Sequence, residues 1–141
     1  GTLLIGALGK DLNTKTEAGA VYVFSSQGEF QMTLQAPNPQ KGDHFGETVA
    51  IMNEYLVVAA PGHDAAGIDA GTVFFFNRQT GLLRTMMSNP SDNTGVADLF
   101  GLSLGATGEH LVVGVPYGDL PEMPDSGEVH QFFFQFKANL N

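Results

Sequence analysis

The sequence predicts an all-β fold built from repeated four-stranded units, and three observations support this prediction. Short runs of β-forming residues are separated by Gly, Pro, Asn and Asp, and no stretch combines a 3.6-residue period with good helix formers. The same landmarks recur at a spacing of a little over fifty residues. Glycine (18 residues) and phenylalanine (11) are abundant in the 141-residue chain, whereas charged residues make up 15%. This composition suits sheets with tight turns better than helices.

The glycines that open one strand of each unit set the period. Gly71 follows Gly19 by 52 residues, and Gly127 follows Gly71 by a further 56. Each leads into a β-type run, and the other runs recur around it in a constant order. The strands are expected at 48–52 and 102–106 (first), 3–7, 56–60 and 111–115 (second), 20–24, 72–76 and 128–132 (third), and 30–34 and 82–86 (fourth), with 136–140 as a further candidate.

A period of this length with four strands is typical of a β-propeller blade. The chain should therefore hold about three antiparallel blades: a partial blade at 1–44, a full blade at 45–99 and a third blade at 100–141. The second strand of each blade should be buried on both faces, because its residues are almost all apolar.

Two kinds of residue mark the repeat. The Phe of each Phe-Gly pair should pack between blades, and the Gly should let a neighbouring backbone approach closely. A proline should end the second strand, because it cannot donate to the strand ladder. Phe45-Gly46 is followed by Ala59-Ala60-Pro61, Phe100-Gly101 is followed by Gly114-Val115-Pro116, and Gly6-Ala7-Leu8 is a degenerate first copy.

This motif resembles the FG-GAP repeat of integrin α-subunit propellers and their bacterial and protist relatives. The resemblance covers essentially the whole chain and implies an arc of a larger, seven-bladed propeller. Three blades alone would expose apolar faces at both open ends, which is costly. We therefore expect the partners to include the remaining blades of the same polypeptide or further copies of the chain.

The resemblance also implies a function. It points to a non-catalytic extracellular or cell-surface module for adhesion, with loops on one propeller face that bind a protein or carbohydrate ligand. Two alternatives stay open. One is a structural repeat subunit of an extracellular assembly or filament, and the other is an accessory propeller domain of a larger enzyme.

No cofactor is required by this interpretation. Family members often carry a DxDxDG calcium loop between the first and second strands of a blade. Here those connections are Asn53-Glu54 and Gly108-Glu109, and hairpins this short cannot supply the six to eight oxygens that calcium prefers. Calcium stays possible only at another place in the chain.

Acidic pairs in the loops between the second and third strands are the candidates for such a place. The pairs are Asp11 with Glu17, Asp64 with Asp69, and Asp119 with Asp125. They should gather on one propeller face, where they could hold a cation. The alternative, which the varying spacing favours, is that the carboxylates bind nearby backbone N–H groups. His63 could join a metal site, but no second histidine stands at zinc-binding spacing, and no catalytic residue is predicted.

Four phenylalanines near the C-terminal end predict an assembly surface, because so much aromatic surface needs a partner, either the next blade or another subunit. They are Phe132, Phe133, Phe134 and Phe136.

Charge and composition exclude several other classes of protein. The net charge of −9, from 15 acidic and 6 basic residues, argues against nucleic acid as a partner. The absence of cysteine from the sequence excludes disulfides and thiol catalysis. No apolar run reaches the length of a membrane-spanning helix, so direct membrane insertion is not expected.

Overall fold

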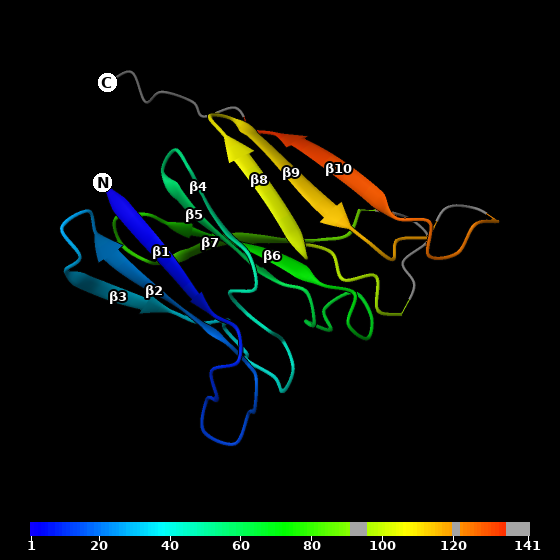
Figure 1. Ribbon diagram of the computed structural model, residues 1–141, viewed down its shortest axis with the longest axis horizontal. Coiled ribbons are helices and arrows are strands. Elements are labelled where there is room, and N and C mark those ends of the chain that lie inside the picture. The colour runs from blue at the N-terminus through cyan, green and yellow to red at the C-terminus, as the bar shows by residue number, and fades with distance from the viewer. Residues whose placement is uncertain (91–95, 120–121, 135–141) are drawn as a thin grey trace.

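A computed structural model describes residues 1–90, 96–119 and 122–134, and within these ranges it contains strands and no helix. The strands follow one another along the chain as Figure 1 shows. Their bounds are β1 Thr2–Ala7, β2 Ala20–Ser25, β3 Phe30–Leu34, β4 Val49–Met52, β5 Tyr55–Ala60, β6 Thr72–Asn77, β7 Leu83–Ser88, β8 Ser103–Thr107, β9 His110–Val115 and β10 Glu128–Phe133.

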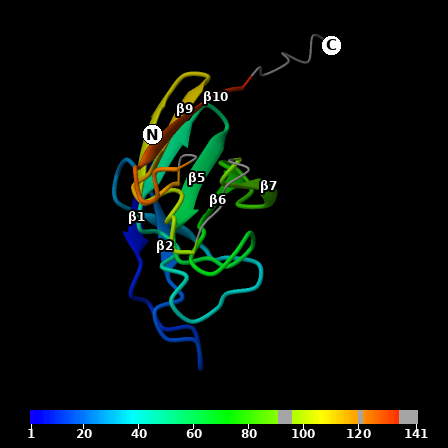
Figure 2. The same cartoon turned by 90° about the vertical axis from the view of Figure 1, so that its right-hand side faces the viewer.

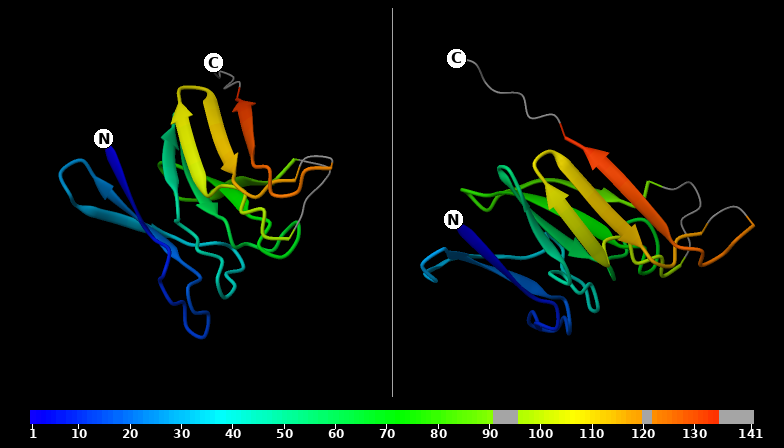
Figure 3. Two further views of the ribbon diagram at one scale, coloured as in Figure 1. Left: turned by 45° about the vertical axis from the view of Figure 1, so that its right-hand side comes forward. Right: turned by 45° about the horizontal axis from the view of Figure 1, so that its top comes forward.

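The strands form three antiparallel sheets in chain order, β1-β2-β3, β4-β5-β6-β7 and β10-β9-β8. Figure 3 shows the three sheets side by side. The predicted all-β fold of propeller-type blades is therefore confirmed. Each sheet takes its strands from one of the segments 1–44, 45–99 and 100–141, whose boundaries stay predictions. The candidate strand at 136–140 lies outside the described residues.

Strand positions agree with the sequence prediction to within one or two residues, and the largest difference is at β7, which ends two residues later than predicted. The pairing of β6 with β7 changes register between Phe75 and Phe76. The first sheet repeats this irregularity between Val23 and Phe24, where β2 pairs with β3. A bulge of this kind bends and twists the outer strand, and hydrophobic periodicity alone does not locate it.

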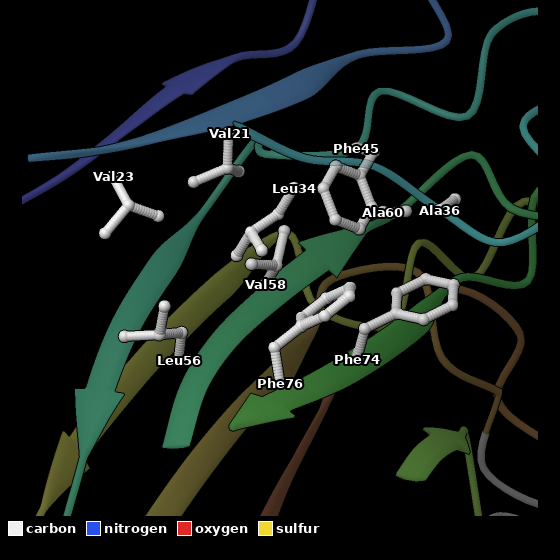
Figure 4. Packing of buried hydrophobic residues seen from close by; sticks show 10 residues of the cluster. All are labelled: Val21, Val23, Leu34, Ala36, Phe45, Leu56, Val58, Ala60, Phe74 and Phe76. Carbon is white, nitrogen blue, oxygen red and sulfur yellow. The ribbon is translucent and has the colours of Figure 1, made fainter. Parts of the chain in front are cut away.

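Two apolar layers lie between the sheets. The first joins the β1-β2-β3 sheet to the middle sheet and includes Val21, Phe45 and Phe74, which Figure 4 shows with their neighbours. The second layer joins the middle sheet to the third and includes Val73 and Phe100. Since each layer is formed by residues from two sheets, the contact between blades is the core of this chain.

The Phe-Gly pairs connect one blade to the next, as the sequence predicts, because the backbone N of Phe45 donates to the carbonyl of Ala18 at 3.0 Å and that of Phe100 donates to the carbonyl of Ala70 at 3.0 Å. Phe45 and Phe100 are fully buried. The ring centroid of Phe45 lies 5.5 Å from that of Phe74 in an edge-to-face contact, and the Phe100 ring lies 6.3 Å from that of Phe132. Edge-to-face pairs add a favourable electrostatic contribution to the burial of the rings.

The glycine of each pair has two reasons to be glycine. Gly101 has a φ of +95°, in the region that side chains disfavour, and a Cβ there would lie 2.8 Å from the Cβ of Ala59 on the preceding sheet. Gly46 has a φ of +94°, and a Cβ there would lie 2.8 Å from the carbonyl oxygen of Ala20. Both positions therefore combine a left-handed backbone with a close approach between sheets.

The burial predicted for the second strand holds fully only in the middle sheet. Every residue of β5 after Tyr55 is buried. In β1, Leu3 and Ile5 are 49% and 54% exposed, and β9 alternates between buried and exposed positions before Gly114. The prediction is wrong for these two strands because, among the described residues, another sheet packs on only one face of each.

The phenylalanines near the C-terminal end also depart from the prediction. Phe132 and Phe134 pack against the second apolar layer, and the Phe134 ring lies 5.2 Å from that of Phe75. These two rings join the second and third sheets, so they do not form a free assembly surface. Phe133 is exposed, and Phe136 lies outside the described residues.

We expect Phe100→Ala to lower the free energy of unfolding by about 3–5 kcal/mol, the usual cost of truncating a buried aromatic side chain. Denaturant unfolding measures this loss. Phe133→Ala removes the same side chain from an exposed position and should cost at most about 0.5 kcal/mol. Similar losses in the two variants would contradict the burial of Phe100 between sheets.

Gly101→Ala should lower the unfolding free energy by about 1–3 kcal/mol through backbone strain alone. The clash with Ala59 should add to this loss. Gly105 provides the control, since a Cβ there meets no atom within 4 Å. Thermal melts of Gly101→Ala and Gly105→Ala should therefore differ clearly. Equal melting temperatures would mean that the close approach of the two sheets at Gly101 is wrong.

Candidate functional site: the loops between β1 and β2, β5 and β6, and β9 and β10

Three loops, one per sheet, form the candidate site. They join β1 to β2, β5 to β6 and β9 to β10, and they lie at the end of the sheets opposite the β4–β5 and β8–β9 turns. Figure 2 shows the β1–β2 loop at the lower end of the molecule and the β5–β6 loop above it. The topology therefore brings the three acidic pairs to one face, as the sequence predicts.

Within each acidic pair, the first carboxylate holds the backbone of the second residue. The backbone N of Asp69 donates to Oδ1 of Asp64 at 2.8 Å. The same bond, from Glu17 to Asp11 at 2.9 Å and from Asp125 to Asp119 at 2.8 Å, recurs in the other two loops. This arrangement agrees with the loop-holding interpretation, in which an Asp side chain substitutes for a backbone acceptor.

The second residue of each pair has a left-handed backbone. The φ angles are 54° at Glu17, 52° at Asp69 and 52° at Asp125. Two residues later, Gly71 donates its N–H to the carbonyl of His63 at 3.0 Å, and Gly19 and Gly127 make the corresponding bonds. Left-handed residues are costly unless other contacts fix them, which gives the Asp side chain a clear structural task.

The loops also fix the start of the following blade. The carbonyl of Glu17 accepts from the backbone N of His44 at 3.1 Å, and that of Asp69 accepts from Leu99 at 3.2 Å. His44 has a φ of 52°, and its bond to Glu17 places its backbone at the turn between the two blades. The acidic pairs therefore stand at a structural joint between blades.

The described residues contain no group of three or more His, Asp or Glu side chains placed to hold a metal ion. His63, the candidate metal ligand, is nearly buried. Its Nδ1 lies 3.0 Å from Oγ1 of Thr72, and its ring contacts Phe74 edge-on. His63 thus packs against β6 and does not project into the loop.

Asp43 lies two residues before Phe45 of the first Phe-Gly pair. It is a buried carboxylate that the sequence analysis did not single out. It is 1% exposed, and its Oδ2 accepts from the backbone N of Gln40 at 2.7 Å. Its Oδ1 has no hydrogen-bond partner. Burial raises the pKa of Asp43, although the Gln40 N–H and the nearby His63 act in the opposite direction. Only the tertiary structure could show this burial, because Asp43 lies in a polar stretch of sequence.

Exposed apolar side chains on the loop face were also missed by the sequence analysis. Ile68 in the β5–β6 loop is 61% exposed, and Tyr117 and Met123 in the β9–β10 loop are 49% and 54% exposed. Large apolar side chains exposed on a loop are suited to contact a partner, since such residues dominate many interfaces. The sequence could have indicated this exposure, because these residues lie between the end of one strand and the start of the next, outside the core.

The sheets and the loop geometry define a chain of β-propeller blades joined by Phe-Gly pairs. A comparison with protein families shows that residues 29–76 match the model of the FG-GAP repeat. This stretch contains Phe45-Gly46, Ala59-Ala60-Pro61 and strands β3, β4 and β5, and it ends one residue before the end of β6. Residues 29–76 are therefore an FG-GAP repeat, which confirms over this stretch the resemblance seen in the sequence. A comparison with curated proteins found no match.

In the part of the chain that the structure describes, no helix is long and apolar enough to cross a membrane.

We expect Asp64→Ala to lower the unfolding free energy by about 0.5–1.5 kcal/mol, the usual value of one hydrogen bond. Asp64→Asn keeps an oxygen that can accept from Asp69 and should lose much less. Thermal melts of both variants test this difference. Equal losses would show that the charge of Asp64, and not the bond to the backbone, stabilises the loop.

The raised pKa of Asp43 predicts a pH dependence of stability. Between the ordinary Asp pKa and the raised value, the folded state holds a proton that the unfolded state has released, so this residue's contribution to stability falls as the pH rises. Asp43→Asn should therefore flatten the loss of stability that occurs as the pH rises above the ordinary Asp pKa. Urea unfolding at several pH values measures the slope, with Asp11→Asn at an exposed carboxylate as the control. An unchanged slope in Asp43→Asn would contradict the pKa shift.

Proposed function

We propose that this chain is a non-catalytic binding module of an extracellular or cell-surface propeller, and that it presents its loops to a protein or carbohydrate ligand. The observation that carries the proposal is the loop face itself. Hydrogen bonds from Asp side chains hold each loop, and the loops display Ile68, Tyr117 and Met123 to solvent. A rigid scaffold with exposed apolar side chains binds with a small entropy cost. The adhesion role and the location rest on the resemblance to the integrin-type propellers.

A non-catalytic role agrees with the use of the acidic residues. The carboxylates of Asp11, Asp64 and Asp119 accept hydrogen bonds from backbone N–H groups, so they act as structural groups of the loops. For the same reason we propose that the loops need no cation. Calcium should leave the melting temperature unchanged, and a calcium-dependent rise that Asp64→Asn abolishes would overturn this part of the proposal.

Binding by the loop face can be tested with a loop variant and a matched control. The loop variant replaces three exposed apolar residues by serine: Ile68, Tyr117 and Met123. The control replaces three exposed apolar residues of the outer strand region: Phe30, Leu82 and Met86. Each protein is applied to an array of extracellular domains and glycans and to intact cells. Binding should be lost in the loop variant and kept in the control, and bound ligand should be recovered chemically unchanged.

Two results would contradict the proposal. Loss of binding only in the outer-strand control would move the contact surface away from the loops. Recovery of a chemically altered ligand would show that the module is catalytic.

A second candidate function, a structural repeat subunit of an assembly, is favoured by the outer faces of the first and third sheets. Leu3 and Ile5 are exposed on the first sheet, and Val129 is 72% exposed on the third. A groove of about 390 Å³ lies on the third sheet beside Gly114 and Val129. On the second sheet, the equivalent residues are Ala59 and Val73, and Gly101 of the next blade packs against them.

The proposed occupants of these faces are the remaining blades of the same polypeptide or further copies of the chain. The native mass, compared with the denatured mass, distinguishes these possibilities. A denatured mass well above 15.0 kDa favours further blades in one polypeptide. A denatured mass of 15.0 kDa with a native mass several times larger favours assembly of copies, and a stable monomer of 15.0 kDa would contradict both.

A further inference from the structure

A polar cleft of about 700 Å³ lies between the first and second sheets, away from the candidate loops. The first sheet contributes Thr2 from β1 and Gln31 and Met32 from β3. The second sheet contributes its two turns, from β4 to β5 and from β6 to β7. A volume of this size lies within the range of about 300–1,000 Å³ that small-molecule sites occupy.

Arg78 is fixed in this cleft by contacts with both sheets. Its backbone N donates to the carbonyl of Glu54 at 2.7 Å, and its Nε donates to Oγ1 of Thr2 at 3.1 Å. The bond at Nε leaves the terminal guanidinium N–H groups as donors on a planar, oriented side chain. An arginine held in this way is already ordered before a ligand binds, which reduces the entropy cost of binding.

Comparison with the next pair of blades shows that the fold does not need a polar cleft at this position. There, Phe134 takes the place of Arg78, since its backbone N donates to the carbonyl of Glu109 at 2.8 Å. The Phe134 ring packs 5.2 Å from that of Phe75. The same joint is thus closed by aromatic packing between the second and third sheets and lined by polar groups between the first and second.

The lining has the chemistry of a site for a neutral, hydroxyl-rich ligand. Carboxamide side chains dominate it, and each offers both a donor and an acceptor. They are Gln31, Asn53, Asn77 and Gln79. Asn77 accepts from the backbone of Gln79 and Thr80 through its Oδ1, so its amino group is the part that it can offer to a ligand. Met32 supplies an apolar surface.

The charges in the cleft also favour a neutral ligand. Glu54 and Arg78 are the charged side chains of the lining, and their formal charges cancel. A protein partner would need large apolar anchors, and Met32 is the one large apolar side chain of the lining. We propose that this cleft binds a neutral saccharide. The proposal rests on the recognition function proposed above and names a second, separate surface for it.

The test is a titration of the ¹⁵N-labelled chain, followed by NMR, with glucose, galactose, mannose and N-acetylglucosamine in turn. At least one sugar should shift the amide signals of residues 53–54 and 77–79 with a dissociation constant in the millimolar range. The double variant Asn53→Ala/Gln79→Ala removes two exposed carboxamides and should weaken binding about tenfold. Gln35→Ala, at an exposed glutamine outside the cleft, should bind as the unmutated chain does.

Thermal melts of the variants establish that they are folded before affinities are compared. The saccharide site is overturned if none of the four sugars shifts the cleft signals, or if the double variant binds as tightly as the control. Shifts confined to residues 62–70 would also overturn it, but they would support the loop face of the proposed function. Conversely, cleft shifts together with an inactive loop face would support the saccharide site and count against the loop proposal.

Discussion

The packing of each Phe-Gly pair against the preceding sheet is the interaction on which the rest of this structure depends. Phe45 and Phe100 are fully buried between sheets, and the glycines beside them allow a contact that a Cβ would block. Because a three- or four-stranded sheet cannot bury both of its faces by itself, each blade is stable only against a neighbour. The Phe-Gly pair thus turns separate sheets into one core.

The acidic loops serve this same contact. The Asp side chain fixes a left-handed residue, and that residue's carbonyl binds the backbone just before the Phe-Gly pair of the next blade. The Asp side chains of these loops are therefore structural groups, because the hydrogen bonds that they accept keep the loop backbone in place. A face built in this way can vary its exposed side chains while its backbone stays fixed, which suits recognition.

The two blade junctions share a hydrogen bond but differ in the side chains that line them. Both junctions share the bond between the two turns, at Arg78 and at Phe134. One is closed by an aromatic contact, and the other is lined by carboxamides, Glu54 and Arg78. Since the fold forms with either lining, it does not require polar residues at the first junction, and these residues are available to bind a ligand.

The sequence by itself determined the strands, their order and the Phe-Gly positions, because these depend on local periodicity and on residues that only a turn or a close contact requires. It also placed the acidic pairs in the loops. It could not decide between cation binding and loop holding for Asp64, since that depends on where the amide of Asp69 points. The half-exposed faces of β1 and β9, the packing of Phe134 on Phe75 and the burial of Asp43 were decided by tertiary structure. Each of them depends on which sheet lies beside which, and that information is not contained in any single stretch of the chain.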